Sequence, residues 1–220
     1  MHPTQISLLL NAARPVAPPS NPAADLSRID DYKRLLIRVA RTVCPSFVVR
    51  DGMKPLLNDL LLWCLSAPGR LDPSKGLWLW GDIGSGKTTM LHVILRFCRI
   101  VRPADAEGNP YGFRISNAIE VCSGYQRKGY DGIQTYIDSR RQAFDELGSE
   151  TIPTGYYGNT ENVFQYILQR RYDRRHTSFT HVTTNLSVDQ IAEVYGARIY
   201  DRCKEMFNFV PMRGATFRKK

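Results

Sequence analysis

The pattern of hydrophobic and polar positions predicts two helices near the start of the chain. The first carries apolar side chains from Leu35 to Ala40 among basic residues, and the second is strongly apolar over residues 56–65. Pro55 suits the first turn of the second helix, because proline lacks the amide hydrogen that this position leaves unpaired. We expect the two helices to form a short helical N-terminal module over residues 27–69.

From residue 70 onward the pattern alternates between strands and helices. The expected elements are a strand over 75–80, a helix over 88–100, a strand near 112–115, a helix or loop through 126–130, a segment that ends at Glu146, a helix over 161–175, a strand over 179–185 and a helix over 188–194. Strands that alternate with helices favour a parallel sheet covered on both faces. We therefore predict an α/β domain over residues 70–220, without internal repeats.

A proline-rich segment precedes these elements. Residues 11–24 consist mainly of proline and small residues, which bury too little apolar surface to offset the entropy of ordering the backbone. We expect residues 1–26 to be a flexible N-terminal segment.

Composition indicates a soluble, cytoplasmic protein without a membrane partner. The hydrophobic and charged fractions, 43% and 23%, are ordinary for a globular chain, and no apolar run approaches the roughly 18 residues that span a bilayer. The five cysteines form no Cys-x-x-Cys pair. We therefore expect them to be reduced and mostly buried, not zinc ligands or disulfides.

The net charge indicates what kind of partner to expect. At +9, the chain favours a polyanion, because clustered lysines and arginines displace counterions from a phosphate backbone. Charge alone also fits a solvated basic face, so the motifs must decide.

The strongest motif follows the apolar strand over 75–80. Residues 81–88 have the pattern G-x-x-x-x-G-K-T, in which glycines let amide N–H groups turn toward a phosphate at the positive end of the next helix. Lys87 would reach the β- and γ-phosphates of ATP, and the Thr88 hydroxyl would coordinate Mg²⁺. A glycine turn with an exposed lysine is the alternative, but the strand before the loop and the helix after it favour a phosphate loop. The residues expected to bind ATP are Gly81, Asp82, Ile83, Gly84, Ser85, Gly86, Lys87, Thr88 and Thr89.

An acidic pair could complete an ATP-hydrolysing site. Asp145 would hold Mg²⁺, and Glu146 would act as the general base toward water. The alternative is a solvated acidic turn, because the polar residues 140–142 precede the pair where a buried strand ordinarily carries apolar side chains.

A polar residue also ends the next expected strand. The Asn185 amide could lie beside the γ-phosphate and the attacking water. Its alternative role is a helix cap, a role that Ser187 could take instead.

Together these pieces resemble the AAA+ ATPases of the bacterial replicative-helicase loader and insertion-sequence transposition helper group. The resemblance covers residues 70–218 and rests on the phosphate loop and on the segments 144–150, 180–186 and 195–202. It implies a P-loop NTPase fold of AAA+ type without a lid domain, and it gives Asp145 and Glu146 the metal and water-activating roles and Asn185 the role of γ-phosphate sensor.

The same resemblance implies a homo-oligomer. The family's Gly-x-Arg-Ile-x-Asp-Arg stretch inserts an arginine into the ATP site of a neighbouring subunit, and here it matches Arg198 and Arg202. Such an arginine stabilises charge on the transferring phosphoryl group. Alternatively, one of the two pairs with Asp201 or Glu205 on the same helix.

Three basic stretches are candidate DNA contacts. Arg127, Lys128 and Tyr130 fit best, since cations follow a backbone while rings stack on bases. A helix over 170–176 carries four arginines and could instead be a solvated face or a subunit contact. The tail over 213–220 is the third.

Several functions fit these features. The first is an ATPase that loads or remodels a replicative helicase on single-stranded DNA. The second is a transposition helper that acts on duplex DNA with a transposase or recombinase. A P-loop small-molecule kinase, with the 170–176 arginines as a lid, and a structural subunit that binds ATP without turnover are the remaining alternatives.

Overall fold

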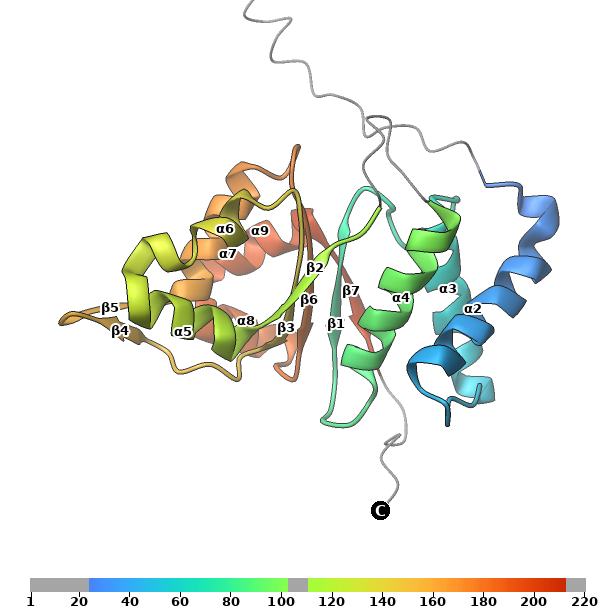
Figure 1. Ribbon diagram of the computed structural model, residues 1–220, viewed down its shortest axis with the longest axis horizontal. Coiled ribbons are helices and arrows are strands. Elements are labelled where there is room, and N and C mark those ends of the chain that lie inside the picture. Colours follow the sequence, from blue (N-terminus) through green and yellow to red (C-terminus); the bar gives the residue numbers. More distant parts are fainter. Residues whose placement is uncertain (1–23, 103–110, 213–220) are drawn as a thin grey trace, which may run out of the picture.

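A computed structural model describes residues 24–102 and 111–212 (Figure 1). The flexible segment expected over 1–26 lies outside the described residues as far as residue 23, and so does the basic tail over 213–220. Within the described part, no helix is both long and apolar enough to cross a membrane.

Five strands in the described part form one parallel sheet in the order β2-β3-β6-β1-β7. They are β1 (Gly76–Trp80), β2 (Arg114–Asn117), β3 (Arg141–Leu147), β6 (Phe179–Thr184) and β7 (Phe207–Pro211). The central strands β1 and β6 are almost wholly buried, as expected for parallel strands covered on both faces. This confirms the predicted parallel sheet; β7 is an additional strand that the sequence pattern did not indicate.

Helices cover both faces of the sheet (Figure 1). On one face lie α2 (Ile29–Val43), α3 (Lys54–Cys64) and α4 (Lys87–Val101). On the other lie α5 (Ala118–Lys128), α6 (Gln134–Asp138), α7 (Val163–Asp173), α8 (Val188–Tyr195) and α9 (Ala197–Met206). Single 3₁₀ turns occupy η1 (Leu26–Arg28), η2 (Asp51–Met53) and η3 (Gly129–Gly132).

The two helices expected as an N-terminal module share a hydrophobic core with the sheet. Leu36 of α2, Trp63 of α3 and Phe97 of α4 belong to one buried cluster that also contains Leu79 of β1. The first face of the sheet is therefore covered by α4, with α2 and α3 packed beyond and beside it.

The polar residues before the acidic pair lie in a buried strand. Gln142 is 1% exposed, and its amide donates hydrogen bonds to the Ser116 hydroxyl at 3.1 Å and to the Ala143 carbonyl at 3.0 Å. Because its polar groups are paired inside the sheet, the polar approach to Asp145 does not prevent a strand there.

A short hairpin replaces the start of the helix expected over 161–175. β4 (Thr154–Tyr156) pairs with β5 (Asn159–Glu161), and α7 begins only at Val163. Tyr157 and Gly158 both have positive φ, which suits a two-residue hairpin turn. Asn162 then caps α7 by accepting a hydrogen bond from the Gln165 amide. The five cysteines are free and four are buried, as expected.

Candidate functional site

The expected site residues converge at the carboxyl ends of three neighbouring strands. The glycine loop joins β1 to α4, Asp145 lies in β3, and Asn185 directly follows β6. Since β6 lies between β3 and β1 in a parallel sheet, the three strand ends meet at one edge. This edge is where an α/β sheet ordinarily binds a ligand.

The glycines of the loop have conformations that other residues rarely adopt. Gly84 and Gly86 have φ of 84° and 88°, and Gly86 immediately precedes α4. At Gly81, with φ of 146°, a Cβ atom would come within 2.5 Å of the Met212 carbonyl oxygen. The loop therefore depends on glycine for both its turn and its close approach to the end of β7.

Lys87 is a nearly buried cation held by neutral acceptors. It is 8% exposed, and its Nζ donates to the carbonyl oxygens of Gly81 at 2.7 Å and Asp82 at 2.8 Å. A third hydrogen bond, at 2.7 Å, goes to Oδ1 of Asn185. Burial lowers the pKa of Lys87, while Asp82, Asp145 and Glu146 oppose that shift. No ion pair of Lys87 occurs in the described residues, so its charge is available to an anion.

Asp145 accepts two hydroxyl hydrogen bonds on one oxygen. Thr88 Oγ1 donates to Asp145 Oδ1 at 2.9 Å, and Thr183 Oγ1 donates to the same oxygen. Asp145 is itself mostly buried. The structure thus joins the first turn of α4 to β3 and β6 through this carboxylate. Thr183 was not among the expected site residues.

Glu146 is exposed and sits on an irregular part of β3. The pairing of β3 with β6 shifts register between Phe144 and Leu147, and Glu146 has φ of 60°. Its amide donates to Thr183 Oγ1 at 3.0 Å, and its Oε2 accepts from Asn117 Nδ2 at 3.0 Å. A left-handed glutamate is an unfavourable conformation of the kind that clusters at functional sites.

Asn117 is a contact of Glu146 that the sequence reading missed. It ends β2 opposite Asp145, and its Oδ1 also accepts the Ile119 amide at the start of α5. In the sequence, this contact is indicated only by an asparagine at the end of a strand. That signal is ambiguous, because asparagine there also caps the following helix.

The cap role weighed for Asn185 is filled by Ser187. Ser187 caps α8 and forms a capping box with Gln190. The Asn185 side chain instead contacts Lys87.

The two arginines of α9 lie in different environments. Arg198 is exposed in the first turn, whereas the Arg202 guanidinium carbon lies 4.8 Å from the centre of the Tyr172 ring. In the described residues neither pairs with Asp201 or Glu205, and neither contacts the phosphate loop. Asp201 pairs with Lys204.

The basic stretch after α5 is exposed beside a tyrosine cluster. Arg127 and Lys128 end α5 with exposed side chains. Tyr130 is 47% exposed, and its hydroxyl donates to Glu161 of β5 at 2.7 Å. Tyr157, at the hairpin tip, is 89% exposed and therefore presents more free ring surface than Tyr130.

The arginine run over 170–176 is not a free basic face. Arg171 is fully buried and donates to carbonyl oxygens of α6 and β6. Arg174 pairs with Asp138, and Arg175 lies 3.7 Å from a Glu205 oxygen. The DNA-contact and kinase-lid interpretations of this run are weakened, because three of its four arginines have structural partners.

The oxygen donors at the loop fit Mg²⁺. Thr88 and Asp145 offer one hydroxyl and one carboxylate already in contact. No group of three or more histidine, cysteine or acidic ligands occurs among the described residues. Mg²⁺ at nucleotide sites typically uses one or two carboxylates, with phosphates and waters as its other ligands.

These features define a P-loop NTPase fold of AAA+ type: a glycine loop between a parallel strand and a helix, faced by a carboxylate on β3 and an amide after β6.

Several solved structures share this fold, and each of the following three matches it with a structural-match probability of 1.00. The first is the DnaC helicase loader, at 18% identity over 78% of this chain and 96% of that chain, with a TM-score of 0.57. The second is DnaI, at 21% identity over 82% and 93%, with a TM-score of 0.56. A putative primosome component from Streptococcus pyogenes serotype M3 matches at 18% identity over 78% and 85%, with a TM-score of 0.57. The predicted resemblance to the helicase-loader group is confirmed at the level of the fold. No protein-family model matches the sequence, and the search of curated proteins gives no significant match.

Proposed function

We propose that the chain binds ATP with Mg²⁺ and hydrolyses it as a subunit of a homo-oligomeric AAA+ assembly that loads or remodels a replicative helicase on single-stranded DNA. The observation that carries this proposal is the convergence of Lys87, Asn185, Thr88 and Asp145 at one edge of the sheet. The fold shared with a helicase loader supports the choice of partner.

Phosphate binding follows from the position of Lys87. Its present acceptors are two carbonyls, the Asn185 amide oxygen and, at 3.5 Å, the Ser85 hydroxyl, all neutral, so a phosphate oxygen at the loop would give the cation an anionic partner. Backbone N–H groups at the start of α4 add donors for the phosphates. Mg²⁺, held by Thr88 and Asp145, would neutralise part of the phosphate charge.

Glu146 is the group that would take a proton from the attacking water. Its carboxylate is exposed and accepts a hydrogen bond from Asn117 Nδ2, so one oxygen is oriented while the group stays accessible to water. Asn185, in contact with Lys87, would contact the γ-phosphate as the sensor. Asn117 is a positioning residue, because it acts through Glu146.

An arginine from a neighbouring subunit would complete the site. Arg198 is free to extend to another copy, whereas Arg202 is engaged with the Tyr172 ring, so Arg198 is the better choice for the trans-acting arginine. Hydrolysis would then depend on assembly.

The single-stranded DNA contact would lie at the end of α5. Arg127 and Lys128 supply cations, and Tyr130 with the neighbouring hairpin supplies rings on which bases can stack. The transposition-helper alternative keeps the same ATP site and differs in its DNA form and partner protein.

The test is ATP hydrolysis by the purified chain alone, with single-stranded DNA and with duplex DNA. Lys87→Ala should abolish ATP binding, and Glu146→Gln should retain binding while turnover falls by about 10²–10⁴-fold. Lys54→Ala and Glu120→Gln are matched controls, because both side chains are exposed on other elements and should leave turnover unchanged.

Stimulation by single-stranded DNA supports the loader, and stimulation by duplex alone supports the transposition helper. Phosphate transfer to a small acceptor, without a DNA effect, would contradict the proposal. ATP binding without turnover under every condition would instead identify a structural subunit.

A further inference from the structure

The first helix of the described residues carries an unusual run of charge. Between residues 32 and 50 the sequence contains five basic residues and no acidic ones. Four of the five lie on α2, where a buried row of Leu36, Val39 and Ala40 faces the core. The basic residues therefore gather on the outer side of this helix.

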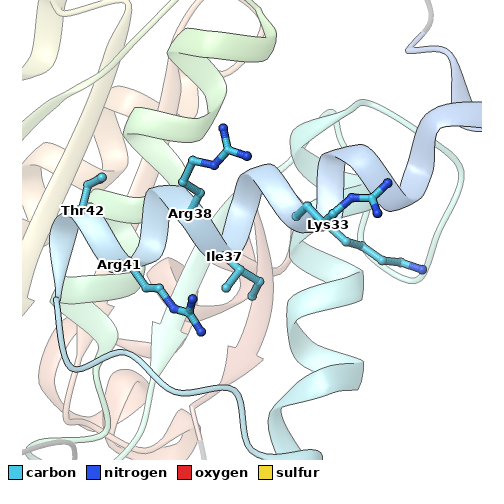
Figure 2. Close-up of a pocket in the computed structure, with 6 residues that line it drawn as sticks. Lys33, Ile37, Arg38, Arg41 and Thr42 are labelled. Carbon is cyan, nitrogen blue, oxygen red and sulfur yellow. The ribbon is translucent and has the colours of Figure 1, made fainter.

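Figure 2 shows how these side chains lie. Lys33, Arg34, Ile37, Arg38, Arg41 and Thr42 line one shallow hollow on the surface of α2. Positions three, four and eight residues apart share a helix face, so the four cations extend over roughly 12 Å of the helix axis. We call Lys33, Arg34, Arg38 and Arg41 the α2 basic face.

The two ends of the α2 basic face differ in pairing. Lys33 lies 3.0 Å from Asp30, and Arg34 lies 2.8 Å from Asp31, both as exposed pairs with acidic residues of the first turn. Such exposed pairs contribute little to stability. Arg38 and Arg41 form no ion pair or hydrogen bond in the part of the chain that the structure describes. Unpaired charge is thus concentrated in the second half of the helix.

A further cation adjoins this end. Arg96 of α4 is exposed, and its guanidinium lies 3.4 Å from the Thr42 carbonyl oxygen. The stabilising effect of a basic residue on the helix dipole applies to Arg41 alone, which is the only one of the four in the last turn. The i,i+3 pairs of Lys33 and Arg34 also stabilise the helix a little, so helix stability leaves Arg38 unexplained.

The chemistry of the face selects a phosphate backbone. Three of the four residues are arginines, whose planar guanidinium groups bind phosphate oxygens in a bidentate manner. Ile37 is the one apolar residue among the six that line the hollow, and the aliphatic stems of the basic side chains supply the rest of its apolar surface. No aromatic ring lines this hollow, and the adjoining hollow, which shares Arg34 and Arg38, has one ring, Tyr32, whereas single-strand sites typically stack successive bases on several rings.

We propose that the α2 basic face binds the sugar-phosphate backbone of duplex nucleic acid without sequence preference. A duplex fits because it presents phosphates outward at one charge per about 1.7 Å, and about 12 Å of helix matches three to four phosphates of one strand. The face lies on the opposite side of the sheet from Arg127 and Lys128 (Figure 1). The inference extends the proposed function, which places single-stranded DNA on that other side.

The test is fluorescence anisotropy of the full chain with a labelled 20-base-pair duplex and with a single strand of thymidines, between 50 and 200 mM salt. No nucleotide is added, so the result is independent of ATP turnover. Arg38→Ala/Arg41→Ala should weaken duplex binding about 10-fold and reduce the log–log salt slope by about 2, while single-strand affinity changes less than about 2-fold.

Two matched double variants show whether duplex binding depends on where the cations lie or on their charge. Lys54→Ala/Arg170→Ala removes two exposed cations elsewhere and should leave the slope unchanged. Arg38→Lys/Arg41→Lys keeps both charges and should retain the slope. Thermal melts should be equal for all variants, because these side chains are exposed.

Three results would overturn the proposal. They are an unchanged duplex affinity and slope in Arg38→Ala/Arg41→Ala, an equal loss for duplex and single strand, and displacement of the duplex by poly-glutamate at the same charge concentration. The last would show that the α2 basic face takes an acidic protein surface.

Discussion

The arginines of α7 and those of α2 differ in what their guanidinium groups contact. On α7, Arg171 is enclosed by carbonyl oxygens, and Arg174 and Arg175 have acidic partners on α6 and α9. On α2, Arg38 and Arg41 extend from the helix without such partners in the described residues (Figure 2). In the denser arginine run, one arginine is thus buried and two more are paired with acidic residues of neighbouring helices.

The difference follows from what each helix packs against. Arg171 reaches the carbonyls of Tyr136 and Ile137 at the C-terminal end of α6, where the helix dipole is negative. It also bonds Thr180 and Phe179 of β6. Within residues 24–102 and 111–212, the outer side of α2 faces no such element. Residue spacing along a helix does not determine the role of a basic residue; the neighbouring backbone does.

The largest effect is expected from Arg171→Met. Burial, aided by Arg174, lowers the pKa of Arg171 to about 10, so the group remains charged at pH 7. Its removal leaves several buried carbonyls without donors, and we expect a loss of about 3–5 kcal/mol in the free energy of unfolding. Urea denaturation measures it. Arg170→Met, at the exposed neighbour, should change stability little; equal losses for the two variants would contradict the buried role of Arg171.

The next effect concerns the buried histidine of β6. His181 is fully buried among Trp63, Phe113 and Phe179, and its Nδ1 accepts the Leu77 amide at 3.2 Å. Burial, with a smaller contribution from Arg171, lowers its pKa to about 3. The unfolded chain binds a proton below pH ~6.5 that the folded chain does not bind.

Stability should therefore be at its full value above pH ~6.5 and fall by up to about 1.4 kcal/mol per pH unit between 6.5 and 3. Urea denaturation at pH 8, 6.5 and 5 measures the slope. His181→Gln, whose side-chain oxygen can still accept the Leu77 amide, should reduce the slope of the unfolding free energy against pH by the amount that about one proton contributes. His176→Gln, at an exposed histidine, should not change this slope. If the His181→Gln slope matches that of the unmodified chain, His181 is not the group that titrates.

The proposed ATP site shows which features a sequence alone can locate. Lys87, Asp145 and Asn185 were predictable together, because Lys87 follows the loop after β1, Asp145 lies near the end of β3 and Asn185 follows β6, and parallel strands bring their carboxyl ends to one edge. Their individual catalytic roles remain predictions. Asn117 and Thr183 were not predictable, because their contacts depend on the register of β2 with β3 and on the shift in pairing between β3 and β6.

The same dependence on contacts made only in the folded chain explains the remaining differences between the predicted and observed structure. The hairpin of β4 and β5 is only three residues per strand, too short for a hydrophobic pattern to indicate it. Arg171 resembled its exposed neighbours in the sequence. Its burial depends on α6, a five-residue helix whose end lies beside α7 only in the folded chain.

The smallest effect is expected from Arg174→Ala/Arg175→Ala on DNA binding. Arg174 is paired with Asp138, and Arg175 lies 4.2 Å from the centre of the Tyr172 ring and near Glu205, so phosphate would have to compete with existing partners. Duplex affinity should change less than about 2-fold, and the salt slope should stay within the scatter of repeated titrations, in contrast to Arg38→Ala/Arg41→Ala. The same anisotropy titration measures duplex binding by both double variants. A slope reduced by about 2 in the α7 variant would mean that Asp138 and Glu205 release their arginines to DNA, and pairing would then no longer distinguish the two helices.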